Sequence, residues 1–494
     1  MSRLAANITL FFLLIAYLAL GAAFALQTPA WQAPDEPAHY NYIQFVAEKQ
    51  ALPILSRGEY DQAYNEEFTR TPQNTASLSI DPLRYEDYAP PLYYLLAAPI
   101  YALTDGWLTA LRLFSVLLGA ALIVVTYLIG VEAYPDQLIF ALGGAAFVAF
   151  VPQHLAMLSA INNDSLAELL IALVVLQAMR LFRAPEVSKR RLIGLGVTLG
   201  LGLWTKATFY YTAIPIALVA LALHAFKQPT LKKLPSEPHS WRLFARQALI
   251  VFVPALLIGA LWWIRNLIVY GGFDVMGLAR HNAVVLGQPT TAQWINDYGV
   301  GGLLQRFFTT TYRSFWGQFG WMSTPMPERE YLLLGGLSVV AVSGWVWWLI
   351  ERMRAAPHRT QHHVPATRPP SAPHNGGLEQ ADRMKRPTPQ AILLILLFVL
   401  TVGGYLYYNL TFVQHQGRYL FPALAPIGLA FAIGCWQMLS KLKGLAARLL
   451  ARSTRDWTPW LDEAQLIIFV LVFLYLARLD LVALQRYIIP SLTP

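Results

Sequence analysis

Residues 8–39 read ITLFFLLIAYLALGAAFALQTPAWQAPDEPAH, which joins a long apolar run to a pair of acids. The apolar part, from Ile8 to Leu26, is about as long as the roughly 20 residues that a helix needs to cross a bilayer. Asp35 and Glu36 follow a few residues beyond its end. The stretch therefore predicts a membrane protein with ionisable side chains close to a membrane boundary.

Composition extends this prediction to the whole chain. Of 494 residues, 56% are hydrophobic and only 13% are charged, whereas soluble domains carry roughly 25% charged residues. The apolar residues come in long runs, which predict an all-α polytopic membrane protein. The net charge of +9 does not indicate nucleic acid as a partner, because basic residues of membrane proteins collect on cytoplasmic loops. The single Cys435 lies in an apolar run, which excludes a disulfide framework.

Apolar periodicity predicts about eleven transmembrane helices. The expected spans are 8–26, 107–131, 137–155, 165–183, 191–207, 209–226, 247–266, 331–350, 390–409, 419–438 and 463–482. With the N-terminus inside, most of the short inner loops are basic, as the positive-inside rule requires. The apolar segment 91–104 would place the basic loops outside if it crossed the membrane. We therefore expect a re-entrant or surface helix there.

Three long hydrophilic segments separate the spans. Residues 27–90 form an acidic external loop, and residues 267–330 form a second external loop with three tryptophans. Short amphipathic helices are expected in these loops. Residues 351–388 are rich in Pro, His and Arg, a composition that favours a disordered cytoplasmic linker over a metal site.

The acids after the first span are a candidate active site. Pro34 and Pro37 stiffen the backbone around Asp35 and Glu36, and His39 follows. A carboxylate pair and a histidine at a membrane boundary suit acid–base chemistry. A helix start is the competing explanation, because acids are favoured near helix N-termini.

Four further charged residues have two explanations each. Asp164 either faces Asp35 across a cleft or belongs to a helix cap. Lys206 interrupts an apolar run, where it either snorkels to the interface or contacts a lipid-linked phosphate. Arg265 and Arg418 stand at outer span ends, where aromatic anchoring or phosphate binding by the planar guanidinium would explain them.

Several short motifs accompany these residues in a set order. They are PPLYYLL at 90–96, NND at 162–164, TK at 205–206, WWIRN at 262–266 and GRYLFP at 417–422. Each motif alone is weak. Together with the acid pair they cover most of the chain, and the chain resembles the GT-C membrane glycosyltransferases, above all bacterial relatives of protein O-mannosyltransferases and the aminoarabinose transferase.

The resemblance implies a GT-C-like fold and an inverting glycosyltransferase. In that family an Asp-Glu pair after the first transmembrane helix carries the catalytic aspartate, which implies Asp35 with Glu36 beside it. It also implies a polyprenyl-phosphate-linked sugar as donor and a lipid, glycan or protein as acceptor. The expected substrate-binding residues are His39, Asp164, Lys206, Arg265 and Arg418. A divalent cation is left open, with Asp35 and Asp164 as its candidate ligands, and no other cofactor is expected.

The expected organisation follows from these assignments. Residues 1–226 form a catalytic transmembrane module with a first external loop at 27–106, and residues 227–494 form a C-terminal transmembrane module. We expect a multi-pass protein of the cell membrane, in contact with membrane lipids, with its active site on the external face. The alternative is a transporter or flippase for lipid-linked or polar substrates, which needs ionisable residues near mid-membrane; a non-enzymatic scaffold is a third possibility. An enzyme should show Asp35, Asp164 and Arg418 around one external cavity, whereas a transporter should show a cavity at mid-depth.

Overall fold

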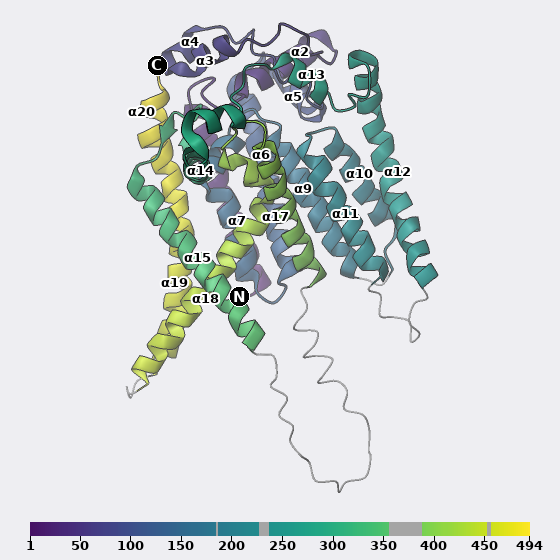
Figure 1. Cartoon of the computed structure of the whole chain (residues 1–494). Coiled ribbons are helices and arrows are strands. Elements are labelled where there is room, and N and C mark those ends of the chain that lie inside the picture. The colour runs from purple at the N-terminus through teal and green to yellow at the C-terminus, as the bar shows by residue number, and fades with distance from the viewer. Residues whose placement is uncertain (184–185, 227–236, 355–387, 452–455) are drawn as a thin grey trace.

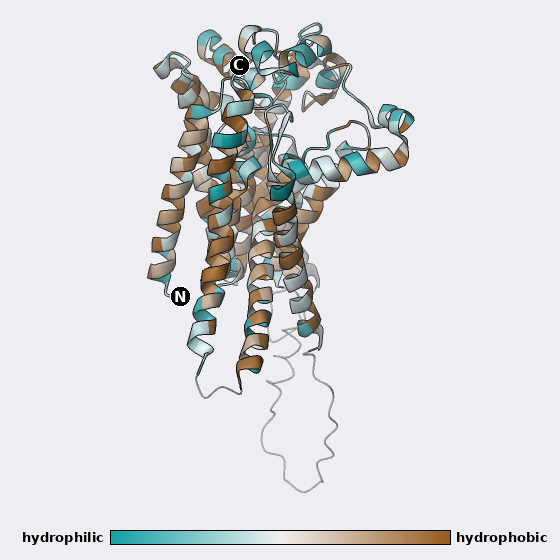
Figure 2. Ribbon diagram, turned by 90° about the vertical axis from the view of Figure 1, so that its left-hand side faces the viewer, coloured by the Kyte–Doolittle hydropathy of each residue, from teal (hydrophilic) through white to brown (hydrophobic). Residues whose placement is uncertain are grey.

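The computed structural model describes residues 1–183, 186–226, 237–354, 388–451 and 456–494. Long helices run side by side and form a bundle, and shorter helices cover one end of it (Figure 1). Figure 2 shows hydrophobic residues along the bundle and hydrophilic residues gathered at the covered end. The arrangement confirms the expected all-α polytopic class.

Nine helices of the described residues are long and apolar enough to cross a membrane. They are α1 (Arg3–Gln27), α6 (Leu108–Ala133), α9 (Asp164–Arg180) with η1 (Leu181–Arg183), α11 (Thr208–Phe226), α12 (Glu237–Tyr270), α15 (Glu328–Arg354), α17 (Pro389–Tyr408), α18 (Leu424–Leu450) preceded by η2 (Gly417–Ala423), and α19 (Thr458–Val482) continued by the π-helix η3 (Ala483–Ile488) and α20 (Ile489–Leu492). All of them fall on expected spans.

A tenth span is broken. α7 (Leu138–Phe150) and α8 (Pro152–Leu158) meet at an angle of 66°. Pro152 explains the break, because a proline disfavours helical backbone at the preceding residue, and Val151 is extended. α7 is buried on all sides among α1, α6, α18 and α19. The centre of the bundle therefore holds α8 and the turn that follows it in place.

The one expected span not yet described, 191–207, contains a helix that is shorter than predicted. α10 (Lys189–Leu203) has 15 residues, which gives a length of roughly 22 Å against a hydrocarbon core of about 30 Å. It packs against α9, α11 and α12. The chain leaves the helix at Trp204 and enters α11 four residues later. Lys206 thus lies in a break between two helices and not inside a span.

The cap, defined as residues 28–107 and 271–327, covers the end of the bundle opposite the N-terminus (Figure 1). Its elements are α2 (Glu36–Lys49), α3 (Gln62–Arg70), α4 (Pro72–Ser77), α5 (Leu92–Thr104), α13 (Leu278–Val284), α14 (Thr291–Trp316), and the antiparallel hairpin of β1 (Gln318–Phe319) and β2 (Thr324–Pro325). With 13 residues, α5 is too short to span and packs against α2 and α6. This length agrees with the prediction of a re-entrant or surface helix at 91–104.

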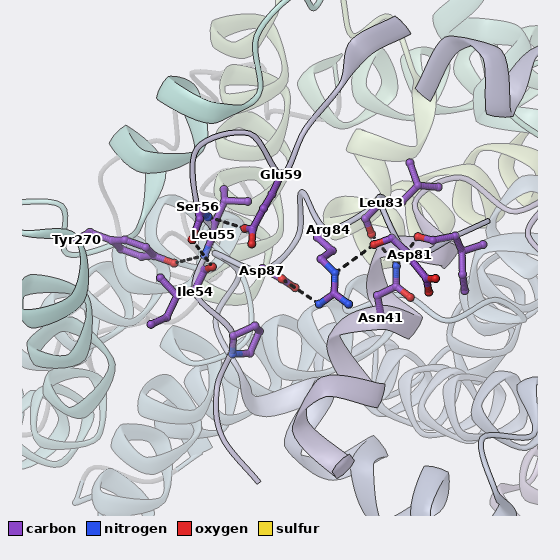
Figure 3. Close-up of polar contacts among 12 residues, drawn as sticks. Asn41, Ile54, Leu55, Ser56, Glu59, Asp81, Leu83, Arg84, Asp87 and Tyr270 are labelled. Atoms are coloured by element: carbon purple, nitrogen blue, oxygen red, sulfur yellow. Dashed lines mark hydrogen bonds and ion pairs between the residues drawn. The ribbon is translucent and has the colours of Figure 1, made fainter. Parts of the chain in front are cut away.

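Hydrogen bonds turn the first loop into a folded layer (Figure 3). The Asn41 amide donates to the carbonyl oxygens of Ile80 and Leu83 at 2.7 and 2.9 Å. The Leu55 backbone N–H donates to the hydroxyl of Tyr270 at the end of α12, at 3.2 Å. The loop is thereby fastened both to α2 and to the bundle. Of the expected linker at 351–388, residues 355–387 lie outside the described part of the chain.

We expect the two halves of the cap to face the non-cytoplasmic side, because the basic loops lie at the other end. In a Cys435→Ser background, cysteines at the exposed positions Arg57 and Asp297 should react with an impermeant maleimide added outside. A cysteine at the exposed Ala447 in α18 should react only after permeabilisation. Labelling of positions 57 and 447 from the same side would contradict this topology.

Candidate active site

Asp35 stands at the junction between α1 and α2, with its side chain turned away from the helix that it precedes. Its backbone is left-handed, with φ of 67°, and its side chain makes no capping hydrogen bond. Instead, Oδ1 accepts from the Tyr85 hydroxyl at 3.0 Å, and Oδ2 lies 2.7 Å from Nη2 of Arg418. Aspartate tolerates this backbone region better than most residues. Helix capping therefore does not account for the carboxylate.

The electrostatic surroundings keep this carboxylate ionised. Burial would raise the pKa of Asp35, but the charges of Arg418 and His39 and the hydrogen bonds from Arg418 and Tyr85 outweigh burial and hold the pKa below its ordinary value. The side chain is 25% exposed, so one edge can meet a ligand. While Asp35 is paired with Arg418, its lowered pKa makes it a weak base.

Arg418 reaches Asp35 from η2, and its place depends on the preceding glycine. The Gly417 backbone N–H donates to Ser314 Oγ in α14 at 2.7 Å, and a Cβ at Gly417 would overlap the backbone of Phe315. Nη2 of Arg418 is used by Asp35, whereas Nε and Nη1 are buried without a hydrogen-bond partner among the described residues. Buried donors without partners are costly. The Nε and Nη1 donors of Arg418 therefore suit an anionic ligand.

A second acid–base pair lies at the start of α9. The Asp164 carboxylate is 2.5 Å from Lys206 Nζ, and both side chains are a little over one quarter exposed. The Asp164 backbone N–H donates to Asn162 Oδ1 at 2.7 Å. Asn162 thus accepts the hydrogen bond from the backbone of this turn, and the Asp164 carboxylate is available to Lys206.

His39 connects the two pairs electrostatically. It is buried in α2, and its Nδ1 lies 2.9 Å from the Tyr94 hydroxyl. Burial lowers the pKa of His39 to about 4; the charges of Asp35, Lys206, Asp164 and Arg418 all act on it. The imidazole is therefore neutral near pH 7. The charges of four expected site residues therefore act on one histidine, although these residues come from distant parts of the sequence.

Glu36, the expected neighbour of Asp35 in the acid pair, is enclosed by the protein. It is fully buried and accepts two hydrogen bonds from the Arg112 guanidinium, at 2.8 and 2.7 Å, and one from the Ile161 backbone N–H at 3.2 Å. Arg112 also donates to the backbone carbonyls of Ala25, Thr28 and Pro29. A carboxylate so enclosed cannot touch a substrate. These contacts connect the segment that carries Asp35 to Arg112 of α6.

Arg265 is likewise engaged elsewhere. Its guanidinium donates to the Pro53 carbonyl and lies over the rings of Trp262 and Tyr270, at 4.9 and 5.4 Å from their centroids. These contacts fasten α12 to the first loop, as aromatic anchoring predicts. The expected phosphate contact is not part of this arrangement.

Sequence reasoning missed Arg112, Tyr85 and Glu86. An arginine in the first turns of an apolar span is a signal that could have indicated Arg112. Tyr85 and Glu86 carry no such signal, because they belong to a loop rich in both residue types.

The arrangement does not fit a divalent cation. Among the described residues, no group of three or more His, Cys, Asp or Glu is placed to hold a metal ion. Asp35 and Asp164, the candidate ligands, each bind a basic side chain. His415 packs its ring against Trp294 and Phe307.

Comparisons with known proteins give a family and several similar folds. The family model described as "Predicted membrane protein (DUF2142)" matches residues 59–427. Among curated proteins, none matches the sequence significantly.

Solved structures give matches over nearly the whole chain. ArnT from Cupriavidus metallidurans bound to undecaprenyl phosphate is 13% identical with a TM-score of 0.44, and the match covers 100% of this chain and 74% of ArnT. An oligosaccharyltransferase from Archaeoglobus fulgidus, tethered with an acceptor peptide, is 12% identical with a TM-score of 0.49; coverage is 98% of this chain and 55% of that one. AglB from the same organism, in complex with an inhibitory peptide and a dolichol-phosphate, is 13% identical with a TM-score of 0.48; the match covers 98% of this chain and 56% of AglB. The chain thus spans little more than half of these two proteins. Likeness at this level does not identify an activity.

Proposed function

This chain belongs to the family described as "Predicted membrane protein (DUF2142)", and from that membership and the geometry at the cap we propose that it is a membrane glycosyltransferase. It moves a sugar from a polyprenyl-phosphate donor to an acceptor, with inversion at the anomeric carbon. The observation that carries the proposal is the Asp35–Arg418 contact of 2.7 Å, in which an acid and an anion-binding group meet at the end of a bundle of apolar helices.

The donor phosphate is proposed to lie on Arg418 and Lys206. Nε and Nη1 of Arg418 lack partners, and a guanidinium matches phosphate oxygens with two parallel hydrogen bonds. Lys206 adds a second positive charge beside the first loop. A lipid-linked donor suits this place, because the hydrocarbon tail can remain among the apolar helices while the phosphate meets the two cations.

Asp35 is proposed as the general base. It takes the proton from an acceptor hydroxyl as that oxygen forms a bond to the anomeric carbon. The bond from this carbon to the phosphate oxygen breaks on the opposite face, and the electron pair leaves with the lipid phosphate. Arg418 and Lys206 stabilise the charge that develops there. A phosphate that engages Arg418 also competes with Asp35 for the guanidinium, and this increases the basicity of Asp35 when the donor is bound.

The remaining assignments follow from this chemistry. His39, neutral and close to both pairs, is proposed to orient the acceptor. The acceptor itself is a lipid, glycan or protein. The proposed site then draws on both expected modules, because residues 1–226 supply Asp35, Asp164 and Lys206, and residues 227–494 supply Arg418. An external site is proposed from the basic loops at the other end.

The function is tested with the purified protein and a panel of polyprenyl-phosphate-linked sugars. Release of polyprenyl phosphate in the presence of membrane acceptors is the expected result. A protein that leaves every donor intact while moving lipid-linked sugars between the leaflets of a vesicle would instead be a flippase.

One observation favours that second candidate. Glu168 and His154, 2.8 Å apart, form a buried ionisable pair within the bundle, although the cavity that Glu168 borders has a volume of only about 10 Å³. Transporters need such groups. The transferase is preferred because the two partly exposed acid–base pairs lie together at the cap and not along a path through the bundle.

We expect Arg418→Ala to reduce donor use about tenfold or more, because a charge-assisted contact in a dry site is worth a few kcal/mol. Arg418→Lys should recover only part of the activity, since it cannot form two parallel hydrogen bonds. Rates of polyprenyl phosphate release at several donor concentrations measure both. Arg313→Ala, which removes a partly exposed arginine at the end of α14 that is paired with Glu328, is the control. Normal donor affinity in Arg418→Ala would remove Arg418 from the site.

A further inference from the structure

Of the three acids Asp35, Asp164 and Glu86, Asp35 and Asp164 are each paired with a basic side chain, whereas the Glu86 carboxylate has no hydrogen bond or ion pair with the part of the chain that is described. It is half-buried in the turn that ends the first loop. Both neighbours are engaged: the Tyr85 hydroxyl donates to Asp35, and Asp87 faces Arg84 at 4.0 Å (Figure 3). Leaving a half-buried carboxylate unpaired is unfavourable. Its placement therefore requires an explanation.

The charges that act on Glu86 are those of the proposed site. They come from four separate elements, namely Asp35 before α2, Asp164 in α9, Lys206 after α10 and Arg418 in η2. The aromatic side chains that feel the charge of Glu86 in turn are Tyr42, Tyr85, Tyr88, Tyr94 and Tyr408. With His39 neutral, three carboxylates face two cations. The cluster has one excess negative charge when Glu86 is ionised and none when it is protonated.

The pKa of Glu86 agrees with this count of charges, because it lets Glu86 gain or lose a proton near neutral pH. Burial, followed by the charge of Asp35, raises the pKa of Glu86 to about 7; Asp164 also raises it, whereas Lys206 and Arg418 lower it. A carboxyl group with this pKa exchanges its proton near neutral pH. The pKa of His39, at about 4, leaves the imidazole uncharged over the same range.

We propose that Glu86 is a proton-binding residue of the site, and that a lipid-linked phosphate enters the site together with a proton that Glu86 takes up. The inference rests on the proposed function, because it places the phosphate on Arg418 and Lys206. An anion added next to three ionised carboxylates is repelled, and protonation of one of them removes that repulsion. By linkage, the anion increases the proton affinity of Glu86 by the same factor as the proton increases the affinity for the anion.

The test measures binding of undecaprenyl methyl phosphate to the purified full chain in detergent. This phosphodiester keeps a single negative charge between pH 6 and 8, so its own ionisation does not change the result. Wild type should bind about tenfold more weakly at pH 8 than at pH 6, because Glu86 loses its proton over this interval. Glu86→Gln should bind with similar affinity at both pH values. Dimethyl phosphate, which lacks the chain, distinguishes the two sources of the phosphate: binding with the same trend means that the phosphate alone is recognised, and failure to bind means that the lipid is required.

Asp87→Asn is the matched control. Asp87 is the next residue, and burial also raises its pKa to about 7, but it faces Arg84 and no group of the site acts on it. It should retain the pH dependence of wild type. As a second measurement, calorimetry of wild type at pH 7 in two buffers of different ionisation enthalpy should show net proton uptake on binding.

The outcomes separate the two proposals. If wild type and Glu86→Gln bind the phosphodiester with the same pH dependence, or if wild type binds without proton uptake, the role of Glu86 is overturned and the phosphate site stands. If wild type binds at neither pH, the phosphate site itself fails, and the inference about Glu86 fails with it.

Discussion

Asp35→Asn is expected to fold normally and to release polyprenyl phosphate 10²- to 10⁴-fold more slowly than wild type, the usual loss when a general base is removed. The amide keeps the size of the carboxylate; its oxygen can accept from Arg418, and its N–H₂ group can donate to the Tyr85 hydroxyl. It cannot take the acceptor's proton. The rate should therefore fall without a matching loss of structure, and thermal unfolding measured beside the rate separates the two effects.

Asp61→Asn provides the matched control for this prediction. Asp61 lies in the same loop and caps α3, where its Oδ1 accepts from the backbone N–H groups of Ala63 and Tyr64. Asparagine caps a helix about as well as aspartate, so activity and stability should stay close to wild type. A stable Asp35→Asn protein with a normal rate would rule out the catalytic assignment and direct attention to Asp164 or Glu86.

Arg112→Met is expected to destabilise the protein by about 3–5 kcal/mol, the loss typical of breaking a buried ion pair from one side. It leaves Glu36 ionised and fully buried, and three backbone carbonyls lose their common donor. Because this pair fixes the chain before Asp35, catalysis should suffer too. Thermal unfolding in detergent measures the change in stability.

A double variant tests the cause of that loss. Glu36→Leu added to Arg112→Met removes the uncompensated charge, so stability should recover in part, whereas the orphaned carbonyls and the Ile161 N–H remain. Arg313→Met is the control, since its exposed pair with Glu328 should be worth about 1 kcal/mol or less. Unchanged stability in Arg112→Met would mean that the pair does not hold the segment in place.

The sequence by itself determined the number and position of most spans. Long apolar runs such as 8–26 and 107–131 are local features, and a bilayer admits only helices for them. The same reasoning predicts that 91–104 does not cross, since the basic loops would otherwise lie on the wrong side, and the short helix α5 agrees with that prediction. Asp35, Asp164, Lys206 and Arg418 were also identifiable, because charges at span ends are rare and need a partner.

Only the tertiary structure decided how these residues are used. Asp35 and Arg418 are 383 positions apart, so nothing local indicates that they touch. Which of two adjacent carboxylates faces the site depends on the left-handed backbone at Asp35, which turns its side chain toward Arg418 and buries Glu36 against Arg112. Arg265 resembled Arg418 in its position at a span end, but its neighbours use it as an anchor. The role of a charged residue depends on its partner. The partner is determined by packing between residues that are far apart in the sequence, which local sequence patterns do not encode.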